Sequence, residues 1–479
     1  MTQPLYYLSA CEVLRQFRSG ELSPIEYLQS LMNRADNVEP LINAFPFTHY
    51  DAALAAAKHA ERAYRDGTAR PLEGLAVAIK NETYVAGQET TNGSVYMKGF
   101  VPDTTDPVPE RLLDAGAIIH ARSAAPEMSI HVCTHSRLHG VTRNPWNLNM
   151  SPGGSSGGAG ASLAAGTTTL ANGTDIAGSI RVPAAMSGVV GFKPPVGRVP
   201  EVSPYNLDPY VHHGSMARSV ADCILMQNVI AGPHYRDITS VSPKLTLPTS
   251  YDSVKNLKIA CSMDLGYFDV DAEVRTAMEA AVATLRRCGA VVDHVELDWD
   301  ERARTTALSH LYSRLGQFFR YHIGTDDPGR SQGSDYFRWF VEQSARVTLE
   351  EFDEATQYEA QMYSALSDVY KDYDALICPT MATTEMAADY DYSRDVICIN
   401  GQPTKVVLGP IMTYPFNTLS RCPVLNIPIG RAPTNNVPIG MQIVGQPFDD
   451  QTVFQIGSAY EGVKKSFYED GDLPSLTQH

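Results

Sequence analysis

Three short segments of the chain carry glycine, hydroxyl and amine residues in patterns that suit chemistry. The first is Gly153–Gly158, in which glycines stand on both sides of Ser155 and Ser156. Glycine permits backbone angles that are closed to other residues, so a ligand can approach the main chain closely here. A flexible linker would have a similar composition, but a patterned small-residue segment follows directly. The pattern therefore favours a binding loop.

The second segment, Gly173–Pro183, places small residues immediately before Ser179. Successive backbone N–H groups in such a stretch can point at one spot. A developing oxyanion needs donors of this kind, and each is worth about 3 kcal/mol of activation barrier. The segment therefore indicates an anion-stabilising loop beside a serine hydroxyl.

The third segment is the apolar run Leu75–Ile79, which ends at Lys80 and is typical of a buried strand. A single lysine after a strand is more often a solvated charge than a buried one. Lys80 becomes a candidate functional residue only in combination with the two serine segments.

This combination resembles the amidase signature family. The shared segments follow that family's order over most of the chain, and residues 300–370 contribute least. They are Gly74–Lys80, Asn144–Asn147, Gly153–Gly158, Gly173–Pro183, Gly188–Pro194, Gly197–Pro200, Met216–Asp222, Asp374–Thr380, Pro415–Asn417 and Gly440–Gly445.

The resemblance implies amide hydrolysis by a Ser-Ser-Lys triad of Lys80, Ser155 and Ser179, with Ser155 in a cis peptide. Lys80 would accept a proton from Ser155, Ser155 would accept one from Ser179, and Ser179 would attack the carbonyl to form an acyl-enzyme. Neither a metal nor an organic cofactor is implied, and the partners are a small amide substrate and water. The oxyanion would be held by backbone N–H groups of Ile176, Ala177, Gly178 and Ser179.

The triad requires Lys80 to be substantially neutral near pH 7, about three pH units below the ordinary pKa of about 10.4. Burial can lower the pKa of a lysine by that much. We therefore predict that Lys80 is buried and that no carboxylate lies close to its amine. A tight pair with an ionised Glu or Asp would argue against this mechanism.

The family resemblance also implies a substrate pocket along Met128–Val132, with contacts from Ser129, Ile130 and Val132. Residues 300–370 are rich in aromatic side chains, which either wall an apolar acyl pocket or form core packing. The sequence favours an aryl or otherwise apolar carboxamide, anilide or hydrazide as substrate.

Two single positions and one four-residue segment depart from the family pattern. Asn81 replaces an aspartate that often follows the lysine, and Ala121–Ala124 stands where many relatives have Gly-Lys-Thr-Asn. Ala177 replaces a usual glycine, which brings the geometry of the oxyanion loop into question because alanine resists positive φ. No member of the triad is changed.

The main alternative within the family is the glutaminase subunit of an aminoacyl-tRNA amidotransferase, which works only in a complex. An alternative fold is an α/β-hydrolase with Ser155 in a G-x-S-x-G elbow, which would need a strand directly before it. A phosphate-binding loop is disfavoured because no Gly-Lys-Ser/Thr ends the segment. His135 and His139 have the spacing of a metal pair but lack an acidic third ligand.

Strands alternate with helices along the chain, which indicates an α/β protein. We expect a large mixed, mostly parallel central sheet covered by helices on both faces, as in the amidase signature fold. Residues 1–479 would form one domain, with an N-terminal helical segment (1–65), a signature catalytic core (70–225) and a variable helical segment (300–370). A small-residue helix is expected over Gly158–Leu170.

The composition limits the partners and the compartment. The net charge is −16, without a basic stripe, so nucleic-acid binding is not expected. The eight cysteines are scattered, which suits reduced thiols in the cytoplasm. Neither a signal peptide nor a membrane-spanning run is apparent. The sequence leaves the oligomeric state open, and a homodimer would be compatible with it.

Overall fold

The computed structural model describes residues 3–322, 332–404 and 407–476. Helices and strands alternate over most of this length, as expected for an α/β chain. The helices are η1 (Leu5–Tyr7), α1 (Ala10–Ser19), α2 (Pro24–Ile42), α3 (Tyr50–Arg65), η2 (Val95–Met97), α4 (Pro107–Asp114), η3 (Glu127–Ser129), α5 (Gly157–Ala165), α6 (Arg181–Ser187), α7 (Val220–Ile230), α8 (Ala272–Arg287), α9 (Arg302–Leu311), η4 (Tyr312–Gly316), α10 (Gln317–His322), α11 (Asp335–Ser344), α12 (Leu349–Val369), α13 (Pro415–Thr418) and α14 (Asp450–Val463). The strands are β1 (Phe47–Thr48), β2 (Ala76–Lys80), β3 (Ile118–Ser123), β4 (His135–Ser136), β5 (Gly140–Val141), β6 (Leu170–Asp175), β7 (Val190–Lys193), β8 (His212–Ala217), β9 (Lys258–Cys261), β10 (Val291–His294), β11 (Ala375–Pro379), β12 (Ile397–Ile399), β13 (Gln402–Thr404), β14 (Val424–Arg431) and β15 (Pro438–Gly445).

One large mixed sheet of 11 strands forms the centre of the molecule, in the order β1-β3-β2-β6-β8-β7-β14-β15-β11-β9-β10. The neighbours from β6 to β11 are antiparallel. Parallel pairing is confined to β3-β2-β6 and to β11-β9-β10. The mixed sheet is confirmed, but the expectation that it is mostly parallel is wrong. Strand–helix alternation suggested crossovers throughout, whereas a short turn joins β14 to β15 and therefore reverses the chain.

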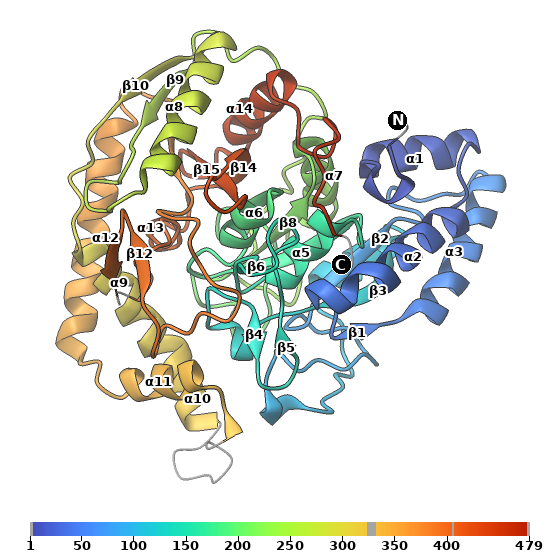
Figure 1. Ribbon diagram of the computed structural model, residues 1–479, viewed down its shortest axis with the longest axis horizontal. Coiled ribbons are helices and arrows are strands. Elements are labelled where there is room, and N and C mark those ends of the chain that lie inside the picture. Colours follow the sequence, from blue (N-terminus) through green and yellow to red (C-terminus); the bar gives the residue numbers. More distant parts are fainter. Residues whose placement is uncertain (1–2, 323–331, 405–406, 477–479) are drawn as a thin grey trace.

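Helices cover both faces of this sheet. On one face, α14 packs against β14, where a Cβ placed on Gly457 would approach Leu425. On the other face, α6 lies against the same strands, where a Cβ on Gly440 would meet both Asn426 and Ala185. Because successive strand residues point to opposite faces, Leu425 and Asn426 mark the two sides. Figure 1 shows α9 to α12 on the side of the molecule opposite to α1, α2 and α3.

The small-residue helix is shorter than predicted. It ends at Ala165, and Gly166 follows with φ of 75°. A Cβ at this glycine would press on the rings of Tyr6 and Tyr7, so the chain turns here. Leu170 then begins β6, a strand that the sequence pattern did not predict, and this strand leads directly into the second serine segment.

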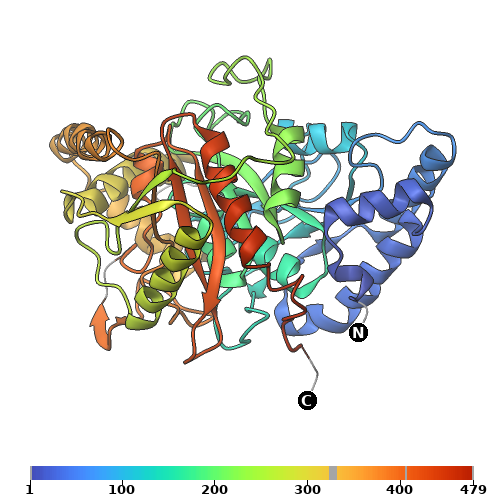
Figure 2. The same ribbon diagram turned by 90° about the horizontal axis from the view of Figure 1, so that it is seen from above.

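The two ends of the described chain lie near each other (Figure 2). The Gln3 side chain donates to the backbone carbonyl of Tyr468 at 3.1 Å, and the ring of Tyr7 stacks on that of Tyr468. The eight cysteines, all within the described ranges, are unpaired. Across these ranges no helix has the length and apolar character needed to cross a membrane.

Candidate active site

Two parallel strands bring the lysine and the second serine segment to one edge of the sheet. β2 ends at Lys80 and β6 ends at Asp175, and the two strands are parallel neighbours. Their carboxyl ends therefore lie side by side, which places Lys80 Nζ 2.6 Å from Thr174 Oγ1. The Lys80 backbone N–H is fixed by Asn172 Oδ1 at 2.8 Å.

Lys80 is completely buried, as predicted. Its amine lies 2.7 Å from Ser155 Oγ, so two of the three predicted catalytic side chains are in direct contact. The prediction that no carboxylate approaches the amine is wrong, because Glu82 Oε2 lies 2.8 Å from Nζ. The resemblance drew attention to Asn81 and not to the residue after it.

The ionisation of this pair is set by opposing effects. Burial lowers the pKa of Lys80 below its ordinary value, although the charges of Glu82 and Asp175 act to raise it. Burial alone would raise the pKa of Glu82, but the Lys80 charge and hydrogen bond outweigh this and lower it. The carboxylate is thus ionised near neutral pH, and the amine loses its proton more easily than a solvated lysine does.

The first serine segment is a tight loop before α5. The Gly154–Ser155 peptide is cis, as the resemblance implied. A Cβ on Gly154 would collide with the main chain at His131 and Val132, so glycine is required by close approach of two backbones. No strand occurs in residues 142–154, all of which the structure describes, so the strand required by a nucleophile elbow is missing.

Ser179 lies just before α6 and is partly exposed. The N–H of Ser156 donates to the Ser179 carbonyl at 3.2 Å, which links the two serine segments. Among the described residues, the amides of Ile176, Ala177 and Ser179 donate no hydrogen bond to the protein. The Gly178 amide, in contrast, donates to Asp175 Oδ1 at 2.8 Å. Three of the four amides predicted for the oxyanion are therefore free of protein acceptors.

The substitution of alanine at position 177 does not distort this loop. The positive φ of 131° falls on Gly178 and not on Ala177. The Ala177 carbonyl accepts a hydrogen bond from Thr413 Oγ1 at 2.6 Å, which fixes the loop from the opposite side. The positive φ of the loop is therefore adopted by a glycine, one residue after the alanine that the sequence analysis had questioned.

Gly178→Ala is expected to lower the rate of reaction at Ser179 by about 10²-fold, the effect of displacing one of the neighbouring free amides from the oxyanion. The reason is that a Cβ here would overlap the Thr413 hydroxyl, and alanine resists the observed φ. The measurement is the rate of active-site labelling, with thermal melting to check the fold. Gly462→Ala is the control, since a Cβ there meets nothing within 4 Å. An unchanged rate for Gly178→Ala would contradict the prediction.

The loop is anchored by a buried ion pair. Arg181 donates to both carboxylate oxygens of Asp175, each at 2.9 Å, and both side chains are fully buried. Its remaining donors reach Thr413, Gln442 and Asn417 at 2.6–2.9 Å. Burial acts to raise the pKa of Asp175, but Arg181 outweighs it and holds that pKa well below its ordinary value.

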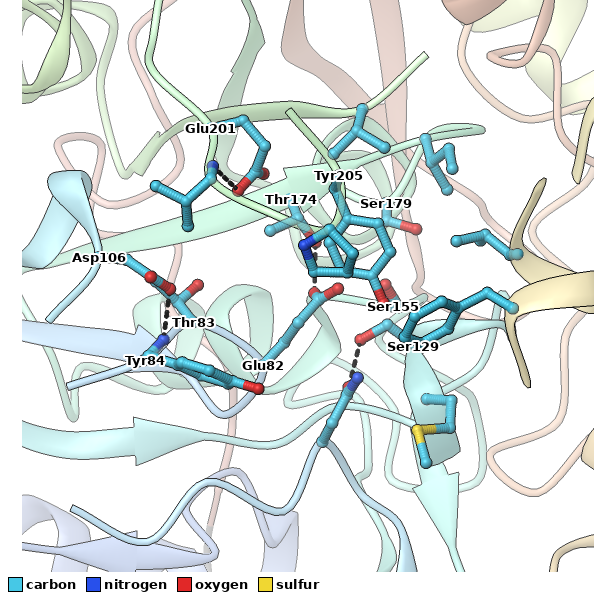
Figure 3. A pocket seen from close by; sticks show the side chains of 18 of the residues that line it. Glu82, Thr83, Tyr84, Asp106, Ser129, Ser155, Thr174, Ser179, Glu201 and Tyr205 are labelled. Carbon is cyan, nitrogen blue, oxygen red and sulfur yellow. Dashed lines mark hydrogen bonds between the residues drawn. The ribbon is translucent and has the colours of Figure 1, made fainter. Parts of the chain in front are cut away.

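A cavity of about 500 Å³ opens over these groups (Figure 3). Ser155 and Ser179 line it together with Glu82. One part of its wall is acidic, with Asp106 and Glu201, and another is aromatic, with residues that include Tyr96, Tyr205, Phe318 and Phe319. The acidic residues come from loops far apart in the sequence and carried no motif.

The predicted pocket residues also lie beside Ser179. Ser129 lines both the main cavity and a smaller one of about 40 Å³, and Ile130 and Val132 line the smaller one. Ser129 has φ of 56° and Met128 has φ of 52°, both unusual for residues with a side chain. Asn92 stabilises this turn by accepting from Met128 N at 2.8 Å and from Ser129 Oγ at 2.7 Å.

Glu127 connects this turn to a distant helix. Its carboxylate accepts from Ser94 Oγ at 2.8 Å and from the backbone N–H of Ser334 at 2.7 Å, next to the start of α11. Its own N–H donates to the Tyr336 hydroxyl at 2.6 Å. The aromatic-rich helical segment is thus attached directly to the pocket wall.

The two histidines with metal-like spacing make separate contacts. His135 Nε2 lies 2.9 Å from the Tyr390 carbonyl, and His139 Nε2 lies 2.8 Å from Thr91 Oγ1. Within residues 3–322, 332–404 and 407–476, no group of three metal-ligating side chains is found.

Known proteins with similar sequences and structures are amide-cleaving enzymes and their relatives. Residues 26–454 match the family described as Amidase. The chain is 32% identical to a glutamyl-tRNA(Gln) amidotransferase subunit from Symbiobacterium thermophilum, covering 96% of this chain and 97% of that protein. It is 30% identical to an acylamidase from Rhodococcus erythropolis, covering 96% of each. The crystal structure of a bacterial aryl acylamidase of the amidase signature enzymes superposes with a TM-score of 0.91 at 26% identity, over 99% of this chain and 100% of that one.

Proposed function

This chain belongs to the amidase signature family of amide hydrolases, and from that premise we propose that Ser179, Ser155 and Lys80 act as its nucleophile, relay and base on a small aryl or apolar amide. The observation that carries the proposal is the 2.7 Å contact between Lys80 Nζ and Ser155 Oγ beneath a cavity that Ser179 also lines. Burial supplies the lowered pKa that a lysine base needs.

The proton follows one route. Neutral Lys80 takes the proton of Ser155, and Ser155 takes that of Ser179, whose Oγ then attacks the amide carbon. The tetrahedral oxyanion is stabilised by the three free amides of Ile176, Ala177 and Ser179. Breaking of the C–N bond expels the amine with the proton returned through Ser155. Water then attacks the acyl-enzyme by the same route and releases the acid.

The shape of the site supports an apolar acyl group. The smaller cavity beside Ser179 is lined mainly by apolar side chains, among them Ile130, Leu311 and Phe340. The main cavity adds the rings of Phe318 and Phe319. Burial of the apolar surface of a ligand against such walls makes binding more favourable by about 25 cal/mol per Å². Anilides, aryl carboxamides and aryl hydrazides have the reacting group and the ring that this arrangement requires.

We expect a fluorophosphonate to modify Ser179 of the isolated protein in one-to-one stoichiometry. The modified peptide is identified by mass spectrometry, and Ser179→Ala is the control that should remain unlabelled. Modification at Ser155 instead would contradict the proposed roles.

The amidotransferase subunit is the second candidate, because a relative with that name is 32% identical over nearly the whole chain. The cavity argues for the first candidate, since glutamine has no aromatic group to match its walls. Hydrolysis of an aryl anilide by the isolated chain, faster than hydrolysis of glutamine, would favour the acylamidase-type activity. Absence of both labelling and hydrolysis would favour the partner-dependent role.

A further inference from the structure

Glu82 occupies a position between the lysine and the cavity. Its side chain is 20% exposed, while that of Lys80 is completely buried. A single oxygen, Oε2, lies 2.8 Å from Lys80 Nζ and accepts a hydrogen bond from Thr174 Oγ1 at 2.7 Å. In Figure 3 the carboxylate of Glu82 points toward Thr174.

In the state required of a base, with Lys80 neutral and Glu82 ionised, the hydrogen atoms in this cluster can be assigned by elimination. A threonine hydroxyl has one proton, and that of Thr174 is donated to Glu82, so Thr174 can only accept from Lys80. An ionised carboxylate also only accepts. A neutral amine has two hydrogens and one lone pair, and the two hydrogens are required by Thr174 and Glu82. In this neutral form the lone pair of Lys80 faces the Ser155 hydroxyl, whereas the ammonium form donates to all three oxygens.

We propose that Glu82 is a positioning residue that fixes the direction of the proton relay, by committing both hydrogens of neutral Lys80 and leaving its lone pair for Ser155. The inference rests on the proposed function of Lys80 as base. Glu82 does not itself receive the proton. It acts through the contacts at 2.8 Å to Lys80 and 2.7 Å to Thr174.

The same contact sets the pH at which the base becomes available. An anion beside the amine favours the ammonium form, so Glu82 opposes the effect of burial on the pKa of Lys80. Removing the negative charge should lower that pKa and extend the neutral form to more acidic pH. The charged or titratable groups around the pair include Asp175 at the end of β6, His213 on β8, and Arg122 on β3, which donates to the Lys80 carbonyl. Asp106 and Glu201 lie beside His213, and Tyr84 and Tyr205 interact with the charge of Glu82.

The test is the pH dependence of Ser179 labelling by a fluorophosphonate in Glu82→Gln. The acidic limb of the rate profile is expected to move to lower pH by about 1–3 units, the usual effect of one close opposite charge. The limiting rate at high pH is expected to fall by about tenfold or more, a part of what a correctly placed base contributes. The fall follows because the new amide N–H₂ can donate to the Lys80 lone pair and turn it from Ser155.

Two further variants separate charge from orientation. Glu201→Gln removes a carboxylate that lines the same cavity, pairs with His213 at 2.9 Å and has no contact with Lys80, so its acidic limb should move less than that of Glu82→Gln. Thr174→Val keeps the charge but removes the acceptor, so the limiting rate should fall while the limb stays in place. This variant carries the test if Glu82→Gln does not fold.

The outcomes distinguish the inference from the proposed function. One outcome is that Lys80→Ala loses labelling while Glu82→Gln keeps both the acidic limb and the limiting rate of the parent protein. In that case the positioning role of Glu82 is wrong, and the role of Lys80 as base is retained. If Thr174→Val also labels at the parent rate, the orientation argument fails independently. If Lys80→Ala labels normally, the proposed base itself is wrong.

Discussion

Lys80→Ala is expected to lower the rate of Ser179 labelling and of amide hydrolysis by about 10⁴-fold or more. Loss of a base that acts as a unit with its nucleophile has effects of this order or larger in other serine hydrolases. Within the described residues the Ser155 hydroxyl has Lys80 as its hydrogen-bond partner, so no second base is in place. The measurement is the second-order labelling rate constant at several pH values.

A matched control is available in Lys193, a second fully buried lysine. Burial lowers the pKa of Lys193 to about 7, and its amine lies 3.2 Å from the Pro194 carbonyl. It lines neither of the cavities beside Ser179. Lys193→Met should therefore retain labelling. Equal losses in the two variants would mean that removal of any buried lysine disturbs the fold, and would contradict the assigned role of Lys80.

Arg181→Met is expected to destabilise the folded protein by about 3–5 kcal/mol. Breaking a buried ion pair from one side leaves an uncompensated charge, which costs about this amount. Here the carboxylate is that of Asp175, and the side-chain amide oxygens of Asn417 and Gln442 also lose the hydrogen bond that the guanidinium donates. The measurement is the free energy of unfolding by urea near pH 7, provided that unfolding is two-state.

The pH dependence of this effect has a defined sign. The folded-state pKa of Asp175 is depressed, so its contribution to stability is present above the unfolded pKa of about 3.9 and is lost as pH falls toward the folded value. The penalty of Arg181→Met should be largest near neutral pH and smaller near pH 4, where the orphaned carboxyl can bind a proton. Arg15→Met removes exposed pairs with Glu12 and Glu21 and should change little at either pH. A constant penalty would argue against the charge as its cause.

Local sequence patterns sufficed to locate the segments that meet at the candidate site. The run Leu75–Ile79 predicted β2 to within one residue, because an apolar run ended by a charge has few other interpretations. The glycines around Ser155 and before Ser179 mark places where backbones approach closely, and these constraints act over a few residues.

The parts that were not predicted depend on contacts distant in sequence or on strand direction. Asp106 and Glu201 reach the cavity from separate loops, and no motif or spacing in the sequence predicts that both line it. The direction of the central strands depends on how the chain crosses the sheet, which alternation of elements does not specify. Glu82 is different, because it belongs to the turn directly after β2, in which the Thr83 N–H donates to the Lys80 carbonyl at 3.0 Å. Its position two residues after Lys80 was a usable signal.

The attachment of Glu127 to the start of α11 has a consequence for altering substrate preference. The turn at Met128 and Ser129 is held by Asn92 on one side and, through Glu127, by Ser334 on the other. A small shift of α11 must therefore move this turn, since a packed interior transmits displacement. Mutant libraries aimed at new amide substrates can accordingly target α11. Substitutions there change the shape of the pocket from a distance and leave the reacting atoms unmodified.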